Sequence, residues 1–183
     1  MTWELIRITG LMALALLTVS TALGILGPTI RRPTGRLTSV SVHLTAGVGG
    51  IALVIAHVFL AVMDSWVQVP WSAAILPGTS AWEPLWVAAG TLAFDLMIVL
   101  AATSAVRTRA PRVWWRAHIL AYPVYALVWV HTLTIGTDRA TPLMIGLAAL
   151  SAALVTAAVV LRLMAPRGPV GTRPRPELEE TLV

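Results

Sequence analysis

Five long apolar stretches, separated by short polar connections, run through most of this chain. Each is close to the ~20 residues that an α-helix needs to cross the hydrocarbon core of a bilayer. None shows the alternating pattern of a membrane β-barrel strand. The pattern therefore predicts an all-α integral membrane bundle of five transmembrane helices, at about 5–27, 37–63, 85–106, 117–135 and 142–164.

The end of the chain has a different pattern. Residues 1–165 are expected to form one membrane domain, whereas 166–183 are rich in Pro, Arg and Glu and have no apolar periodicity. Such a segment cannot bury enough apolar surface to fold, so we expect a disordered cytoplasmic tail. It is too short for a flavin- or nicotinamide-binding domain, and we expect none in this chain.

Composition and charge narrow the class of protein. Of the 183 residues, 57% are hydrophobic and 11% charged, which leaves too little polar surface for a soluble domain. All 13 basic residues are arginines, and all but Arg7 and Arg139 lie on one side of the predicted spans. The positive-inside rule makes that side cytoplasmic, with the N-terminus outside and the C-terminus inside. We expect a multi-pass protein of the cell membrane whose arginines serve topology and lipid contact, not nucleic-acid binding.

The chemistry is concentrated in four histidines, all inside apolar segments. His43 and His57 lie fourteen residues apart in the second span, and His118 and His131 lie thirteen apart in the fourth. Ionisable groups at membrane depth are costly and usually functional, and imidazole is a common metal ligand. Spans two and four run in the same direction, which pairs His43 with His118 and His57 with His131, at levels about 20 Å apart. A di-metal or proton-relay site would place its groups at one depth with carboxylates nearby. The two histidine pairs are too far apart along the helix axes for such a site.

This arrangement predicts two haems stacked across the bilayer. The chain has no cysteine, so a haem would be held non-covalently, as b-type. His43, Gly50 and His57 share one helix face, and Gly50 with Gly47 would let either a flat macrocycle or a neighbouring helix approach closely. The histidines of the fourth span are roughly 140° out of phase in an ideal helix. Either Pro123 alters that helix, or the two haems approach it from different sides.

Other polar residues are candidate haem surroundings. Arg36 and Arg116 are expected near the cytoplasmic pair, and Arg7 and Arg139 near the outer pair, where they would either pair with haem propionates or serve topology. Asp95 is the acid at mid-membrane depth. It would contact a haem ligand, relay a proton or, as we favour, hydrogen-bond to a hydroxyl on its own or a nearby helix.

The histidine spacing resembles that of the ferric reductase-like transmembrane domain shared by ferric reductases and NADPH oxidases. The pattern is His-x13-His in one span and His-x12-His two spans later; respiratory cytochrome b is similar but typically has thirteen intervening residues in both spans. Four short stretches also resemble small actinobacterial members: Arg7-Ile-Thr-Gly-Leu-Met-Ala-Leu, Phe94-Asp-Leu, Trp115-Arg-Ala-His118 and Gly136-Thr-Asp138.

The resemblance implies a module with two b-type haems that moves electrons from a cytoplasmic donor to an outer acceptor. His43 and His118 would ligate one haem, and His57 and His131 the other. Family enzymes fuse a flavin- and NAD(P)H-binding domain to this module, so we expect a separate flavin reductase or a quinol as donor here. The acceptor would be a ferric chelate, oxygen or a partner oxidoreductase. The chain would be the electron-transfer subunit of a ferric reductase-like oxidoreductase.

Two alternatives stay open. One is a quinol-linked cytochrome b subunit that anchors a peripheral oxidoreductase. The other, from a different class, is a non-enzymatic haem carrier or sensor, which would need one haem with an exchangeable ligand. We predict no catalytic side chain from the sequence.

Overall fold

The regular structure is entirely helical in the part of the chain that the computed structural model describes, residues 2–30, 32–137 and 139–166. Five segments are long and apolar enough to cross a membrane, which confirms the predicted architecture. The helices are α1 (Thr2–Leu26), α2 (Pro33–Met63), α3 (Pro84–Ala105), α4 (Pro111–His118), α5 (Ala121–Ile135) and α6 (Pro142–Met164), with short 3-10 helices η1 (Gly27–Thr29) and η2 (Trp71–Ala74). The predicted tail from 167 onward lies outside the described residues.

Proline marks the start of four helices. Pro33, Pro84, Pro111 and Pro142 each occupy the first position of a helix, where the missing N–H would have no intrahelical partner and the fixed φ suits the helix. At α6 the Thr141 hydroxyl also accepts a hydrogen bond from the Met144 N–H. These signals place the helix starts up to several residues before the apolar runs.

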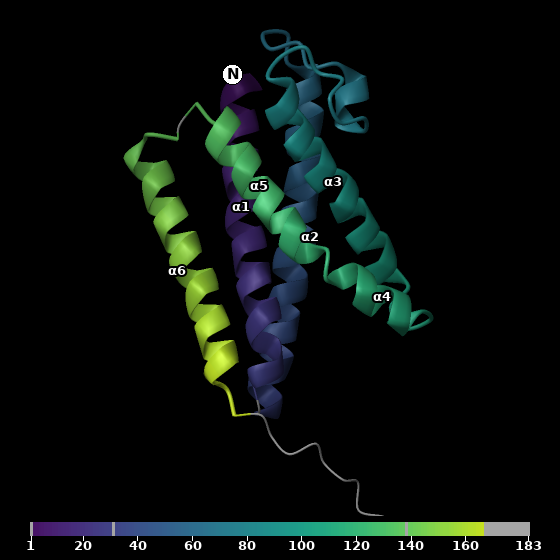
Figure 1. Ribbon diagram of the computed structural model, residues 1–183, viewed down its shortest axis with the longest axis vertical. Coiled ribbons are helices and arrows are strands. Elements are labelled where there is room, and N and C mark those ends of the chain that lie inside the picture. The colour runs from purple at the N-terminus through teal and green to yellow at the C-terminus, as the bar shows by residue number, and fades with distance from the viewer. Residues whose placement is uncertain (1, 31, 138, 167–183) are drawn as a thin grey trace, which may run out of the picture.

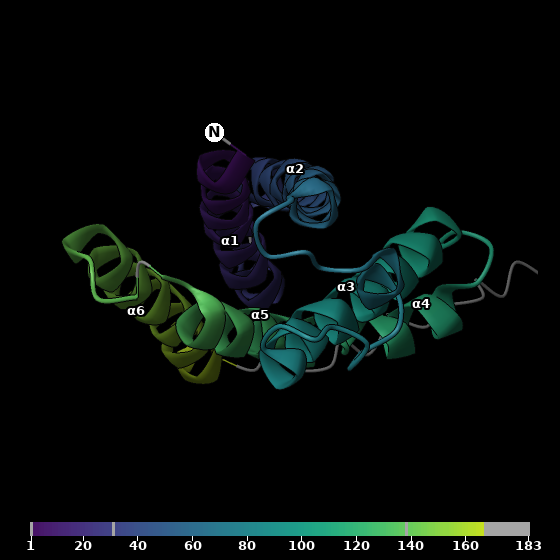
Figure 2. The ribbon, with the colours of Figure 1, turned by 90° about the horizontal axis from the view of Figure 1, so that it is seen from above.

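The helices form two layers (Figures 1 and 2). Viewed from above, α1 and α2 lie together on one side, and α6, α5, α3 and α4 form a curved row on the other. The closest pairings are α1 with α2 and α3 with α5, and α1 also packs against α6 and α5. Helix α1 therefore connects the layers. The outward faces present large apolar side chains such as Leu37, Leu143 and Leu163, as expected for contact with lipid.

The fourth span is not the single helix over 117–135 that hydropathy predicts. Helix α4 begins at Pro111 and ends at His118, and α5 begins at Ala121. Pro123, in the first turn of α5, has no N–H, and in a continuous helix its ring would clash with the carbonyl of Ile119. The interruption falls at Ile119 and Leu120, and the Ile119 carbonyl accepts a hydrogen bond from the N–H of Tyr122 instead. Figure 1 shows α4 leaving the line of α5.

The connection between α2 and α3 folds back over one end of the bundle. Asp64 accepts hydrogen bonds from the N–H groups of Trp66 and Val67, both at 3.1 Å, which closes a turn after α2. Further along, the carbonyl of Ala73 accepts a hydrogen bond of 2.6 Å from the hydroxyl of Thr91 on α3. The loop is thus tied to the helix that follows it.

Candidate functional site

The four histidines meet in the two pairs predicted from their depth. The ring centres of His43 and His118 are 6.1 Å apart with an interplanar angle of 72°. Those of His57 and His131 are 6.3 Å apart at 89°. Each pair takes one ring from α2 and one from the fourth span, α4 for His118 and α5 for His131.

These separations fit one metal ion between each pair of rings. With metal–nitrogen bonds of about 2.0–2.1 Å, two imidazoles on opposite sides of an ion have their ring centres about 6 Å apart. Among the described residues, no group of three or more His, Cys, Asp and Glu is placed to bind a metal ion on protein ligands alone. A haem iron needs only two axial ligands from the protein, because the porphyrin supplies the other nitrogens. The donor sets therefore fit haem.

Hydrogen bonds fix the protonation of three of the rings. The Nδ1 atom of His57 lies 2.9 Å from the carbonyl oxygen of Ile6, and that of His43 lies 2.8 Å from the carbonyl oxygen of Ser20. His131 Nδ1 lies 2.9 Å from the carbonyl oxygen of Trp86. A carbonyl only accepts, so Nδ1 carries the proton in each ring. Nε2 is then the nitrogen left to bind a metal.

His118 is held differently. Its Nδ1 atom is buried and has no hydrogen-bond partner among the described residues. The ring lies against Trp114 on the same helix, with ring centres 5.2 Å apart. Packing, not a hydrogen bond, orients this histidine.

A cavity surrounds the His57–His131 pair. It has about 1460 Å³ of free space, counting its open mouth, and is lined by side chains of α1, α2, α3 and α5. The loop between α2 and α3 adds Val69, Ala73 and Trp82 to the lining. The walls are mostly apolar, as is typical of a cofactor site.

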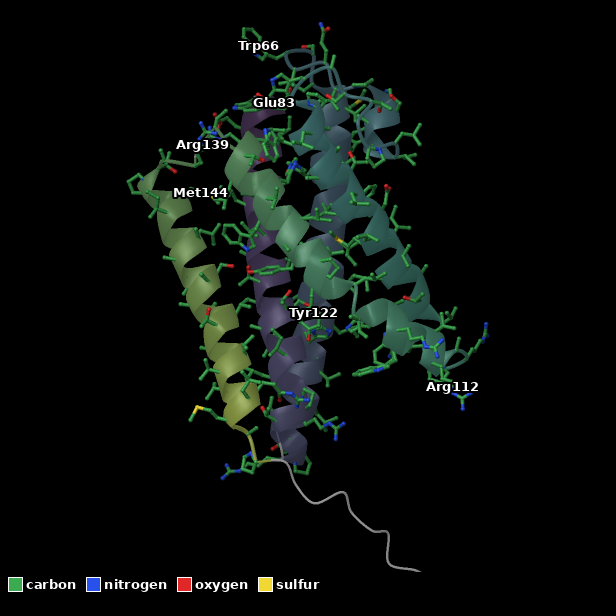
Figure 3. All side chains as sticks on the ribbon, in the orientation of Figure 1. Trp66, Glu83, Arg112, Tyr122, Arg139 and Met144 are labelled. Carbon is green, nitrogen blue, oxygen red and sulfur yellow. The ribbon has the colours of Figure 1, made fainter. Side chains whose placement is uncertain are left out.

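Two arginines lie in the wall of the cavity around His57 and His131. Arg7 and Arg139 both contribute to its lining. Arg7 also forms an ion pair with Glu4 at 2.9 Å, and Arg139 donates to the carbonyl of Thr134 at 3.3 Å. Figure 3 shows Arg139 at the same end as Trp66, with Arg112 at the opposite end.

The other predicted haem surroundings do not line the cavity around His57 and His131. Arg36 and Arg116 are exposed, seven residues before His43 and two before His118 respectively. Gly47 and Gly50 face α1, where an added Cβ would lie 3.3 Å from the Ser20 hydroxyl and 3.0 Å from the Leu17 side chain. Their observed neighbours are those of helix–helix packing.

Asp95 does not line the cavity, although its neighbours Phe94 and Met97 do. No hydrogen bond or ion pair joins it to another described residue. The Thr91 hydroxyl, one candidate partner one turn away, donates instead to the carbonyls of Ala73 and Val87.

Sequence patterns did not reveal a buried cluster of hydroxyl groups between the two histidine levels. The Thr18 hydroxyl lies 2.7 Å from that of Ser151 and 3.1 Å from that of Tyr125, and the Tyr125 and Ser151 hydroxyls also bond to each other. The cluster joins α1, α5 and α6. Isolated hydroxyl residues in apolar spans carry no signal of such a meeting, because it depends on how three helices pack.

The family model that matches this chain is the ferric reductase like transmembrane component, over residues 9–129. The match covers more than half of the chain and includes His43, His57 and His118; it ends two residues before His131. No curated protein and no solved structure gave a match. The match, the five spans and the histidine pairs agree with one another. The chain belongs to the ferric reductase-like transmembrane family, as a multi-pass membrane protein.

Proposed function

We propose that this protein is a membrane cytochrome with two b-type haems, which moves electrons across the bilayer. His43 and His118 would hold the iron of one haem, and His57 and His131 that of the other. The observation that carries the proposal is the separation of the ring centres, 6.1 and 6.3 Å, which suits one iron between each pair. Membership of the family supports it independently.

The protein's part would be to bind each haem, to orient its histidine ligands and to bury it. The Nδ1–H groups of His43, His57 and His131 are directed to helix carbonyls, so each ring presents Nε2 in a fixed orientation. The mostly apolar walls around His57 and His131 would lie against a bound macrocycle and bury it. Arg7 and Arg139, which line this cavity, would donate charge-assisted hydrogen bonds to propionate groups. Bound haem would supply one-electron redox chemistry, with potentials set by ligands, hydrogen bonds and burial.

The arginine distribution supports a direction for this transfer. Most arginines lie at the end of the bundle that holds His43 and His118, which makes it the cytoplasmic end under the positive-inside rule. Electrons would enter there, from a separate flavin reductase or a quinol. They would leave near His57 and His131 for a ferric chelate, oxygen or a partner oxidoreductase.

The first experiment is a reduced-minus-oxidised visible spectrum of the purified full chain, with haem quantified per polypeptide. We expect two low-spin b-type haems in the wild-type chain, and only one haem that stays low-spin in His57→Ala and in His131→Ala. A protein made with ample haem supply that contains none would overturn the proposal. A single weakly held haem would favour a haem carrier or sensor.

A further inference from the structure

Three of the four histidines contact a neighbouring helix in the same way. His57 donates its Nδ1–H to the carbonyl of Ile6 on α1, and its ring lies over Gly10, four residues further along. A Cβ added at Gly10 would lie 3.1 Å from the Cε1 and Nδ1 atoms of His57. The ring therefore occupies the space that a side chain would fill.

The second example lies on the same pair of helices. His43 donates to the carbonyl of Ser20 on α1 and lies against Gly24, where an added Cβ would be 3.3 Å from its Cε1 atom. The two α1 sites are fourteen residues apart, as are the two α2 histidines. The helices α1 and α2 are antiparallel. Moving fourteen residues toward the C-terminus of α1 and fourteen toward the N-terminus of α2 therefore leads from the His57 contact to the His43 contact.

The third example lies on another pair of helices. His131 on α5 donates to the carbonyl of Trp86 on α3 and lies against Gly90, again four residues further along. This is the tightest contact, because an added Cβ would lie 2.6 Å from the Nδ1 atom of His131.

A common physical cause explains the three sites. In an α-helix the carbonyl of residue i accepts from the N–H of residue i+4, and its second lone pair can accept from a side chain. An imidazole that approaches this lone pair passes over residue i+4. Glycine at that position removes the Cβ in its way, although glycine costs about 1 kcal/mol relative to alanine in a helix interior.

The neighbours of these glycines distinguish this role from ordinary helix packing. The atoms nearest to Gly10, Gly24 and Gly90 all belong to imidazole rings. By contrast, Gly49 and Gly50 on α2 face the aliphatic side chains of Leu16 and Leu17.

We propose that Gly10, Gly24 and Gly90, the three glycine openings, are positioning residues for the haem ligands. Each allows one histidine to donate Nδ1–H to a helix carbonyl, which fixes the tautomer, aims Nε2 and raises the basicity of the ligand. Gly10 and Gly90 serve the His57–His131 site, and Gly24 serves the His43–His118 site. The assignment rests on the proposed function, because it concerns how the ligands are held.

The test is alanine substitution at each opening in the full chain. Outer-shell partners of metal ligands are typically worth about 10–100-fold in metal affinity, and we expect losses of haem affinity in this range, in the order Gly90→Ala, Gly10→Ala, Gly24→Ala. In a redox titration, the haem that remains bound should shift to a more positive potential, since a less basic ligand stabilises the oxidised iron less. Only the haem served by that opening should change, so the other reports that the fold is intact.

Two matched controls accompany these variants. In Gly49→Ala the new Cβ would lie 3.2 Å from Leu16, a distance between those at Gly10 and Gly24 but away from any imidazole. Gly146 on α6 has nothing within 4 Å. Both should keep two haems with unchanged potentials.

The outcomes separate the two proposals. Wild-type protein with two haems and alanine variants that match it in affinity and potential would overturn the positioning role while leaving the cytochrome proposal in place. A variant that loses both haems alike would show a packing role for that glycine. Wild-type protein without haem would overturn both.

Discussion

The two histidine pairs have nearly the same spacing but are not held alike. At the His57–His131 site both rings donate to helix carbonyls, and a cavity roofed by the loop between α2 and α3 surrounds them. At the other site His43 is anchored in this way, but His118 Nδ1 has no partner among the described residues and the helix is interrupted just after it. Similar ring separations therefore come with different hydrogen bonding of the rings.

The two helices that supply the carbonyl partners, α1 and α3, differ in the sites that they offer. Helix α1 offers two carbonyl-and-glycine sites at the fourteen-residue spacing of the α2 histidines. Helix α3 offers one at Trp86 and Gly90. At the spacing of His118 and His131, thirteen residues after Trp86, the corresponding carbonyl is that of Val99. The position four residues beyond it, where the other sites have glycine, is Thr103, whose hydroxyl donates to the Val99 carbonyl at 2.7 Å. A second opening at the spacing of His118 and His131 is thus filled by a side chain.

The largest effect that would test this comparison is the loss of one ligand from the His43–His118 site. We expect His43→Ala to lose the haem proposed for this site entirely, because the remaining His118 has no Nδ1 hydrogen bond to orient its ring. His118→Ala should retain it on the anchored His43 as a high-spin, five-coordinate species. Haem quantification with visible and EPR spectra distinguishes the two. Equal and complete loss in both variants would show that anchoring does not matter.

A second prediction concerns access by an external ligand. Since His118 lacks an anchor and precedes the interruption at Ile119, we expect carbon monoxide to displace it from reduced iron. The His57–His131 haem, whose two rings are both anchored, should not react. A carbon monoxide difference spectrum should account for one haem of two, and His118→Ala should leave that fraction unchanged. Binding to both haems, or to neither, would contradict the comparison.

Much of this arrangement could be predicted from sequence because it depends on single helices. Hydropathy reveals the five spans, and the order of spans pairs the histidines by depth. Even the shared face of His43, Gly50 and His57 was correctly expected, since all three meet α1. The sequence did not tell which partner that face meets, and Gly50 packs against Leu17 of α1.

The features that escaped prediction depend on register between helices. The glycine openings are defined by which α1 or α3 carbonyl stands opposite each histidine, and a single sequence does not fix that register. One signal was available: Gly10 and Gly24 have the same fourteen-residue spacing as the α2 histidines. The interruption of the fourth span was also foreshadowed, because Pro123 denies a hydrogen bond to Ile119.

A smaller effect is expected from the hydroxyl cluster, which lies outside both sites. Ser151→Ala removes hydrogen bonds to Thr18 and Tyr125, and interhelical hydrogen bonds of this kind contribute about 0.6–1.7 kcal/mol in membranes. The free energy of unfolding in detergent or lipid should fall by this amount, with both haem spectra unchanged. Ser72→Ala, in the loop, is a control for loss of a hydroxyl. A shifted haem potential would place the cluster within a haem site.

The smallest predicted effect separates the two groups that Ser20 offers to His43. Its carbonyl lies 2.8 Å from His43 Nδ1, whereas its hydroxyl lies 3.1 Å away and also donates to the His43 carbonyl at 3.2 Å. Ser20→Ala keeps the carbonyl, so we expect a small positive shift in the potential of this haem, less than that of Gly24→Ala, and none in the other. Thr38→Ala, which removes an exposed hydroxyl bonded within α2, is the matched control. If Ser20→Ala equals Gly24→Ala in a redox titration, the hydroxyl anchors His43. In that case the symmetry between the α1 sites would be one of spacing alone, because Ile6 has no hydroxyl to offer His57.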